Sequence, residues 1–208
     1  FVDVDTQRDF VEPDGALHVD GAQKCKRVWK RLFDVASKYG VTVLSSLDTH
    51  SRNDPEFKQF PAHCVAGTRG AEKVDGTVLE AHATIGYRKP CSPAEVTVLA
   101  ECTGQIVVEK NTFDMFSNPN VDAVLQALRP HEIYVWGVAL EYCVKAAVLG
   151  LAKRFPEVYV VEDAVRAKDQ SEANSVHREL ESKGIRTIRS DELLERVAQY
   201  QQAGGTAE

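Results

Sequence analysis

The sequence has no apolar run that could cross a membrane and no excess of basic residues. A bilayer span takes about 20 consecutive apolar residues, and no segment approaches that length. The start of the chain also lacks the charged and apolar pattern of a signal peptide. The formal net charge of −6 argues against a nucleic-acid binder, whose surface would be basic. We therefore predict that neither a membrane nor a nucleic acid is a partner.

Paired cysteine spacings such as C-x-x-C are absent as well. The five cysteines are scattered along the chain: Cys25, Cys64, Cys91, Cys102 and Cys143. An odd, dispersed set indicates reduced thiols and predicts a cytoplasmic location. The chain opens inside an expected strand, FVDVD, so we expect a few residues to precede Phe1.

Length and composition predict one domain of alternating strands and helices. A chain of 208 residues with 43% hydrophobic content can form one buried core but is short for two. We predict a single domain over 1–203 and a frayed tail at 204–208. Apolar, β-branched runs predict strands at 1–5, 41–47, 105–109, 132–138, 158–162 and 184–188. Helical spacing predicts helices at 21–38, 121–128, 141–154, 170–183 and 191–202. This alternation favours an α/β fold with a parallel sheet and three layers.

Three chemically useful residues come just after predicted strands: Asp5, Lys110 and Cys143. In an open α/β sheet, groups beyond the strand ends meet in one crevice. Cys143 lies where a strand turns into a helix, and free N–H groups at a helix N-terminus favour a thiolate. An acid, a lysine and a thiol that lie together can form the active site of a cysteine hydrolase. Asp5 would then be the general base, and Lys110 would keep it ionised and lower the thiol pKa.

Each of these residues also has an ordinary structural explanation. Cys143 could be a buried structural cysteine, and Lys110 a solvated surface lysine. A carboxylate at a strand end is often a cap, and Asp3 and Asp9 compete with Asp5 for the catalytic role. The hydrolase prediction rests on the three residues together.

A long irregular region from about residue 48 to residue 84 is the second informative feature, because such segments are usually functional. Four potential metal ligands occur in it: Asp48, His50, Glu56 and His63. Two imidazoles and two carboxylates suit a borderline divalent ion such as Zn²⁺, Mn²⁺ or Fe²⁺. The alternative is a polar loop whose histidines bind nothing. Cys64 is a rival for either ligand or nucleophile.

Three segments resemble, in order, the motifs of one enzyme family. VDTQRDF at 4–10 and DGALHVDGA at 14–22 are similar to D-x-Q-x-D-F followed by G-[SA]-L-x-V-x-G-A. DTH at 48–50 and FPAHCVAGTRGA at 60–71 are similar to D-x-H followed by [WF]-P-x-H-C-x-x-G-T-x-G-A. GVALEYCVKAA at 137–147 is similar to G-x-A-x-x-x-C-V-x-x-[TA]-A. On these motifs the chain resembles the isochorismatase-like cysteine hydrolases, and within them the nicotinamidases.

The resemblance makes the expected fold and catalytic machinery specific. We expect a three-layer αβα sandwich with a six-stranded parallel sheet of order 3-2-1-4-5-6. Cys143 would be the nucleophile, Asp5 the proton-transfer base and Lys110 the third member of a catalytic triad. The backbone N–H groups of Ala139 and Cys143 would form the oxyanion hole, and the peptide bond between Val138 and Ala139 would be cis.

The resemblance also implies one divalent metal ion held by Asp48, His50 and His63, with Zn²⁺ first and Mn²⁺ or Fe²⁺ as alternatives. Glu56 stands where many nicotinamidases have a third histidine. Other members of the family use glutamate, so we predict Glu56 as the fourth ligand.

The implied reaction is hydrolysis of nicotinamide to nicotinate and ammonia through a thioester, a step of NAD salvage. The substrate ring would pack against Phe10 and Phe60, contact Val138 and Ala139, and turn its pyridine nitrogen toward the metal. Phe60 stands where a tryptophan is common, which alters the aromatic wall but keeps its character.

Three other functions stay open from the sequence. The nearest is a related hydrolase of another small amide, ureido or carbamoyl compound. A vinyl-ether hydrolase of the isochorismatase type would need neither the thiol nor the metal residues. A catalytically silent binding module is the third. A sheet-based domain with several exposed helices could also form homo-oligomers.

Overall fold

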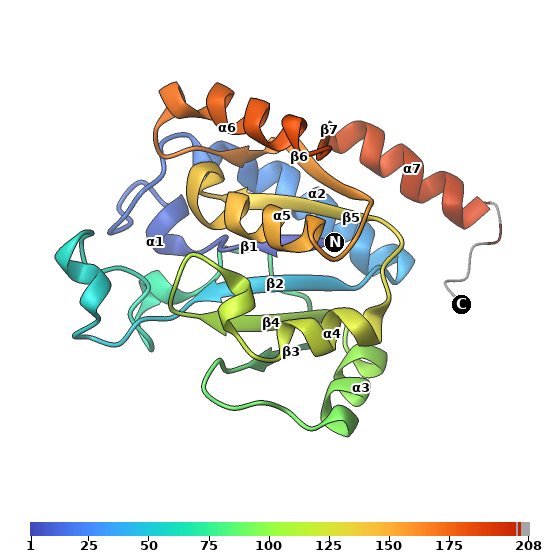
Figure 1. The fold of residues 1–208 in the computed structure, drawn as a ribbon, viewed down its shortest axis with the longest axis horizontal. Helices are drawn as coiled ribbons and strands as arrows, with labels where there is room; N and C mark the ends of the chain where they lie inside the picture. The colour runs from blue at the N-terminus through green and yellow to red at the C-terminus, as the bar shows by residue number, and fades with distance from the viewer. Residues whose placement is uncertain (203, 205–208) are drawn as a thin grey trace.

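The computed structural model describes residues 1–202 and Gly204, and it forms a parallel sheet covered by helices on both faces (Figure 1). The predicted tail at 204–208 lies outside the described residues except for Gly204. The strands are β1 Val2–Val4, β2 Val43–Asp48, β3 His82–Ile85, β4 Gln105–Lys110, β5 Ile133–Val138, β6 Val158–Arg166 and β7 Arg186–Ile188. The helices are α1 Arg8–Val11, α2 Lys26–Tyr39, α3 Pro93–Cys102, α4 Val121–Leu128, α5 Lys145–Ala152, α6 Gln170–Ser182 and α7 Ser190–Gln202.

The sheet has the order β3-β4-β2-β1-β5-β6-β7, and the paired strands are parallel. The six predicted strands follow one another in the predicted order, so the fold prediction is confirmed. A seventh strand, β3, adds to the β4 edge and was not predicted. Only Ile85 of β3 is buried, and His82 is exposed. The strand therefore has no apolar run that would predict it from the sequence.

The helices form two layers, one on each face of the sheet. α2 packs on α7, whereas α3 contacts α4 and α5 contacts α6. Figure 1 shows α4 and α5 in front of the sheet and α2 behind it. This is the three-layer arrangement that right-handed crossovers produce. None of the described helices has the length and apolar character that a membrane span needs.

The core follows from the sequence pattern of the central strands. All six residues of β5 are buried, as expected for a strand covered on both faces. Trp29 and Phe33 of α2 are buried against this sheet, and the Trp29 indole donates a hydrogen bond to the Ala164 carbonyl oxygen at 2.8 Å. Gly40, in the left-handed region, ends α2 as predicted.

One glycine has a direct role where β5 approaches the functional end of the sheet. Gly137 has φ of 125° and pairs with Val4 of β1. A Cβ at this position would overlap the carbonyl oxygen of Val4, so only glycine permits the approach. Gly137 therefore lets β5 lie close against β1 just before the segment that carries Cys143.

Candidate active site

The carboxyl ends of four neighbouring strands place one reactive side chain each at the same edge. Lys110 ends β4, Asp48 ends β2, Asp5 follows β1, and Cys143 follows β5. Lys110 and Asp48 are direct cross-strand partners in the register of the sheet. Asp5 has φ of 48°, which turns the chain out of β1 immediately after the strand. The sheet therefore brings together the residues that the sequence predicted to meet.

Lys110 lies at the centre of this group. Its Nζ is 2.8 Å from Asp5 Oδ2, 3.1 Å from Asp48 Oδ1 and 3.5 Å from Cys143 Sγ. Ser46 Oγ donates to the other oxygen of Asp5 at 2.7 Å. The side chain of Lys110 is 1% exposed, so these contacts are shielded from water. These contacts bring together the acid, the lysine and the thiol of the predicted triad.

Burial sets the protonation of the thiol and of the lysine. Burial raises the pKa of the Cys143 thiol well above its usual value, and the opposing charge of Lys110 does not offset it. For Lys110, burial alone would lower the pKa, but the carboxylates of Asp48 and Asp5 raise it well above the usual value. The resting site therefore holds a charged lysine and a protonated thiol. The charge of Lys110 lowers the pKa of the Cys143 thiol as expected, but burial raises it by more, and a sequence does not show how deeply a group is buried.

The other candidates for base and nucleophile are engaged elsewhere. Asp3 pairs with Lys73 at 2.8 Å and accepts hydrogen bonds from the hydroxyls of Thr6 and Ser45. The carboxylate of Asp9 accepts hydrogen bonds from the backbone N–H groups of Cys64 and Ala16. Both aspartates are thus bound to groups that hold the fold together.

Cys64 is fully buried and is not part of the pocket lining, whereas Cys143 lines the pocket. Burial also raises the pKa of Cys64 well above its usual value. The geometry therefore favours Cys143 as the thiol that a ligand can reach.

A turn of π-helix carries Cys143 into the pocket. It spans Leu140–Val144 and leads directly into α5, with Ala139 in the extended conformation before it. The peptide bond between Val138 and Ala139 is cis, as the family resemblance implied. Ala139 and Cys143 both line the pocket, which places the predicted oxyanion-hole residues at its wall.

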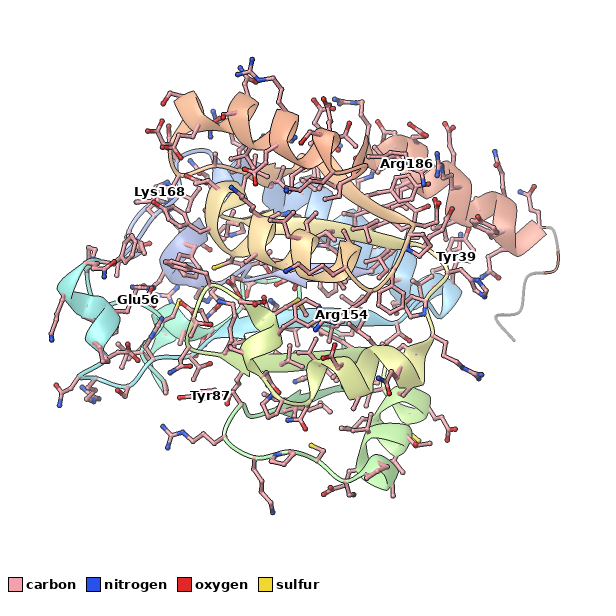
Figure 2. All side chains as sticks on the ribbon, viewed as in Figure 1. Tyr39, Glu56, Tyr87, Arg154, Lys168 and Arg186 are labelled. Atoms are coloured by element: carbon pink, nitrogen blue, oxygen red, sulfur yellow. The ribbon has the colours of Figure 1, made fainter. Side chains whose placement is uncertain are left out.

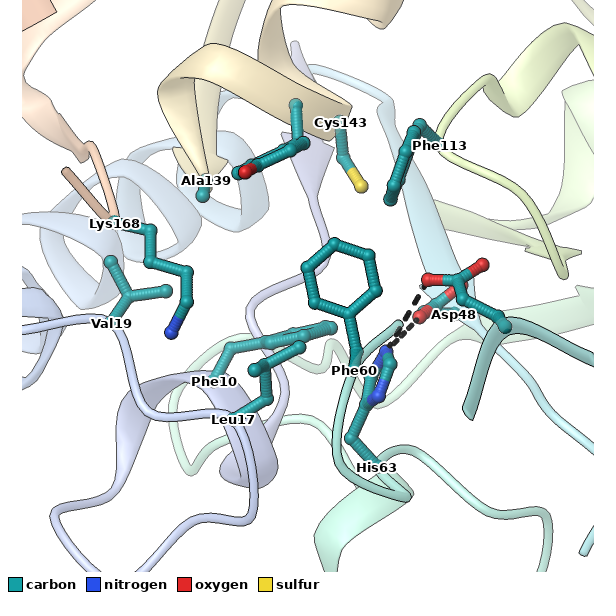
Figure 3. Close-up of a pocket in the computed structure, with 12 residues that line it drawn as sticks. Phe10, Leu17, Val19, Asp48, Phe60, His63, Phe113, Ala139, Cys143 and Lys168 are labelled. Carbon is teal, nitrogen blue, oxygen red and sulfur yellow. Dashed lines mark ion pairs between the residues drawn. The ribbon is translucent and has the colours of Figure 1, made fainter. Parts of the chain in front are cut away.

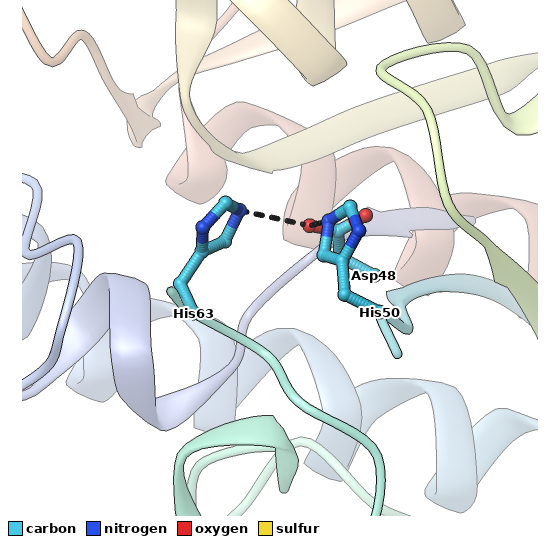
Figure 4. A group of neighbouring side chains, drawn as sticks. All are labelled: Asp48, His50 and His63. Carbon is cyan, nitrogen blue, oxygen red and sulfur yellow. Dashed lines mark hydrogen bonds and ion pairs between the residues drawn. The ribbon is translucent and has the colours of Figure 1, made fainter. Parts of the chain in front are cut away.

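Asp48, His50 and His63 form a second group beside the first (Figure 4). Each offers one ligand atom, and these atoms lie within 4.8 Å of one another. His50 Nε2 is 2.9 Å from Asp48 Oδ2, and His63 Nε2 is 3.4 Å from the same oxygen. Glu56 lies at the edge of this group, with its Oε1 3.8 Å from His63 Nε2.

The donor set and its electrostatics fit a divalent cation. Burial alone would lower the pKa of His50, but its hydrogen bond to Asp48 and the neighbouring carboxylate of Asp54 raise it to about 9. A potential that favours a proton on an imidazole also favours a metal ion in its place. Two imidazoles and a carboxylate suit Zn²⁺ and neighbouring transition metals. The buried Asp–His–His group could therefore hold a metal ion.

Gln7 connects the strand end at Asp48 to the segment that follows Asp5. It was not among the residues that the sequence predicted for the site. Its side-chain oxygen accepts from the Asp48 backbone N–H at 2.7 Å, and its amide donates to the Asp48 carbonyl at 2.8 Å. The same amide also donates to the Ala71 carbonyl at 2.9 Å. Gln7 is fully buried, so these bonds hold the end of β2 against the segment that follows Asp5.

The pocket above these residues has an aromatic and apolar lining (Figure 3). Phe10 and Phe60 belong to the lining, as predicted. Val138 was predicted as a substrate contact but is fully buried and is not among the lining residues. Its contact with a substrate stays a prediction.

Several pocket residues were not predicted. They come from loops and turns: Leu17, Val19, Phe113, Tyr142 and Lys168. The rings of Phe60, Phe113 and Tyr142 lie close together, with centroid distances of 5.3 to 6.1 Å. Two of them could have been predicted from the sequence, because Phe113 closely follows Lys110 and Tyr142 directly precedes Cys143. An apolar pocket with a few polar groups suits a small-molecule ligand.

Comparison with known proteins places the chain in a family. The model of the isochorismatase domain matches residues 86–192, and the chain belongs to the isochorismatase family of hydrolases. The chain is 25% identical to the nicotinamidase of Saccharomyces cerevisiae, covering 89% of this chain and 96% of that protein. It is 26% identical to the nicotinamidase of Escherichia coli, covering 86% and 87% of the two chains.

Similar solved structures support the same family. The pyrazinamidase of Pyrococcus horikoshii, solved in complex with zinc, superposes with a TM-score of 0.74 at 26% identity. The match covers 90% of this chain and 97% of the other. The α/β fold and the family are therefore established together.

Proposed function

We propose that the protein hydrolyses a small carboxamide, with nicotinamide as substrate and nicotinate and ammonia as products. The observation that carries the proposal is the position of Lys110, whose Nζ contacts Asp5 and Cys143 on one side and Asp48 of the metal-binding group on the other. The nicotinamidases among the similar proteins support the choice of substrate. Such a reaction belongs to NAD salvage, and five free cysteines fit the predicted cytoplasmic location.

The raised pKa of Cys143 defines the first step, because a protonated thiol needs a base. Asp5 accepts the thiol proton while Lys110 keeps its charge and holds both groups in place. The thiolate then attacks the carboxamide carbon, and the N–H groups of Ala139 and Cys143 stabilise the tetrahedral oxyanion. Asp5 returns the proton to the leaving nitrogen, and ammonia departs.

A thioester of Cys143 remains and is cleaved by water, with Asp5 as the base that takes the water proton. Return of that proton to the thiolate restores the resting site. A divalent ion at Asp48, His50 and His63, with Glu56 as the proposed fourth ligand, would supply a Lewis acid beside the bound substrate. Phe10 and Phe60 orient the ring between this group and the thiol.

Ammonia release from a panel of amides tests the proposed substrate. We expect nicotinamide to be hydrolysed faster than simple aliphatic amides, because its ring fills the space between Phe10 and Phe60. The panel should include pyrazinamide, benzamide and a carbamoyl amino acid, each measured as kcat/KM. Turnover of the carbamoyl compound alone would reject the nicotinamide assignment and favour the related ureido hydrolases.

Metal analysis tests the second group of residues. We expect the purified protein to bind about one divalent ion per chain, and His63→Ala to weaken its affinity at least about tenfold. Elemental analysis and calorimetry measure this without reference to activity. His131→Ala is the control, since His131 is exposed at the other end of β5. Unchanged affinity in His63→Ala would contradict the site, and Glu56→Gln asks separately whether Glu56 is a ligand.

A further inference from the structure

Asp54 is a carboxylate beside the metal-binding group that belongs neither to the triad nor to the predicted ligands. It precedes the 3₁₀ turn at Pro55–Lys58, and its Oδ1 accepts from the backbone N–H of Glu56 at 3.0 Å. Figure 2 shows Glu56 of this turn and Tyr39 at opposite ends of the molecule, and Tyr39 comes before the start of β2. The turn therefore lies at the end of the sheet where β2 finishes at Asp48.

The second oxygen of Asp54 faces His50. Asp54 Oδ2 lies 3.1 Å from His50 Nδ1, which is an ion-pair contact rather than an aligned hydrogen bond. The side chain of His50 is 0% exposed and that of Asp54 is 10% exposed. The two oxygens of Asp54 therefore have separate partners, one in the backbone of the turn and one in the metal-binding group.

Both side chains of this contact are held in place by their surroundings. The backbone N–H of His50 donates to the Cys64 carbonyl oxygen at 3.0 Å. The His50 ring packs against the rings of Phe57 and His63, with centroid distances of 5.4 and 4.9 Å. Asp54 is held by its bond to the turn that follows it. The contact between Asp54 and His50 is thus part of the fold.

The two histidines of the metal-binding group are arranged in the same way. Each turns its Nε2 toward Asp48 Oδ2, at 2.9 Å for His50 and 3.4 Å for His63 (Figure 4). In each ring the other nitrogen, Nδ1, lies against an oxygen. For His63 this oxygen is the Pro61 carbonyl at 2.7 Å, and for His50 it is the Asp54 carboxylate. These oxygens can only accept, so each Nδ1 keeps its proton and each Nε2 can offer its lone pair to an ion.

We propose that Asp54 is a positioning residue of the metal site, which keeps the His50 proton on Nδ1 and so presents Nε2 to a divalent ion. This inference rests on the metal-binding group of the proposed function and not on the identity of the amide. A carboxylate behind a ligating imidazole also makes the ring a stronger ligand, and such partners contribute about 10- to 100-fold to metal affinity.

Asp54→Asn tests the proposal, because asparagine caps a turn as well as aspartate does but has only one accepting oxygen. With that oxygen on the Glu56 N–H, the side-chain NH₂ group faces His50 and favours a ring proton on Nε2, where it blocks the ligand atom. We expect the affinity for Zn²⁺, measured by calorimetry on chelator-treated protein, to fall at least about tenfold. The thermal unfolding midpoint of the metal-free protein should stay close to that of the wild type.

Asp114→Asn is the matched control. Asp114 is exposed and caps the 3₁₀ turn at Met115–Ser117 in the same way, by accepting from the Phe116 N–H at 2.9 Å. Its replacement should leave the affinity for Zn²⁺ unchanged. Unchanged affinity in Asp54→Asn, or an equal loss in Asp114→Asn, would show that the proposal is wrong.

NMR of isotopically labelled histidine rings gives a second result that a purely structural role would not change. In the zinc-loaded wild type we expect the His50 proton on Nδ1, and a proton on Nε2 would overturn the proposal. Both measurements are made without an amide, so a failure of the amidase activity would not affect them. A wild-type protein that binds no divalent ion would overturn this inference together with the metal site.

Discussion

Cys143→Ala is expected to lower amide hydrolysis by about 10⁴-fold or more while leaving the fold intact, since covalent catalysis has no other thiol within reach of the substrate. Cys143 is 7% exposed and lines the pocket, so its replacement removes one sulfur without burying a charge. The rate of ammonia release measures the first effect. The thermal unfolding midpoint and circular dichroism measure the second.

Cys64→Ala distinguishes the two cysteines that the sequence left as rivals. Cys64 is fully buried and is not part of the pocket lining, so this variant should keep activity within about tenfold of wild type. A thioester trapped on Cys143 during turnover, seen as a mass increase on that peptide, would support the mechanism directly. Substantial hydrolysis by the Cys143→Ala protein would refute it.

Lys110→Met is expected to have the largest combined effect on stability and catalysis. Removing one partner of a buried ion pair costs about 3–5 kcal/mol of unfolding free energy, because it leaves a buried charge uncompensated. Here two carboxylates, those of Asp5 and Asp48, would lose the ammonium that lies within 3.1 Å of both. We also expect kcat to fall by about 10³-fold, since the base and the thiol lose the group that positions them.

The stability deficit of Lys110→Met should depend on pH with a defined sign. Burial alone would raise the pKa of Asp48, but the charge of Lys110 and the hydrogen bonds of His50 and His63 hold it below its usual value in the wild type. A lowered folded-state pKa stabilises the fold above the unfolded pKa, and the variant lacks the part of this stabilisation that Lys110 supplies, so the deficit is largest at neutral pH and shrinks as the pH falls. Urea unfolding at several pH values measures it. A deficit that is constant with pH would contradict this electrostatic origin.

Lys73→Met provides the control, because it removes a second buried lysine that pairs with an aspartate. Lys73 Nζ lies 2.8 Å from Asp3 Oδ2, and Lys73 is not part of the pocket lining. This variant should lose comparable stability but retain most of the activity. Equal loss of activity in the two variants would show that Lys110 acts only by supporting the fold.

The sequence predicted the sheet because the central strands are apolar and bounded by clear breaks. All six expected strands are present in the expected order. The strand β3 and the helix α3 were missed for a physical reason: both lie at the edge of the fold, where little burial is required and the apolar pattern is weak. Ser92 and Glu95 form a capping box that marks the start of α3 and could have identified it.

Residues at strand ends could be predicted as site residues, but those on loops could not. Parallel strands place Asp5, Asp48 and Lys110 at one edge wherever the chain runs afterwards. Lys168 lines the pocket from a loop whose backbone N–H donates to Glu141, a contact between distant parts of the chain. Likewise, Cys143 and Val138 are close in sequence, yet one lines the pocket and the other faces the core.

The four strands that end at or just before Lys110, Asp48, Asp5 and the turn with Cys143 are consecutive neighbours in the sheet, and this adjacency sets the spacing of the backbone around the reaction centre. Neighbouring strands lie about 4.8 Å apart, a separation set by main-chain hydrogen bonds. The backbone positions from which the reacting side chains extend are therefore set by the sheet. The segments that close the pocket, by contrast, are loops whose sequences can change without disturbing those bonds. Divergence in such a fold can give new substrates while the bond-breaking chemistry stays the same.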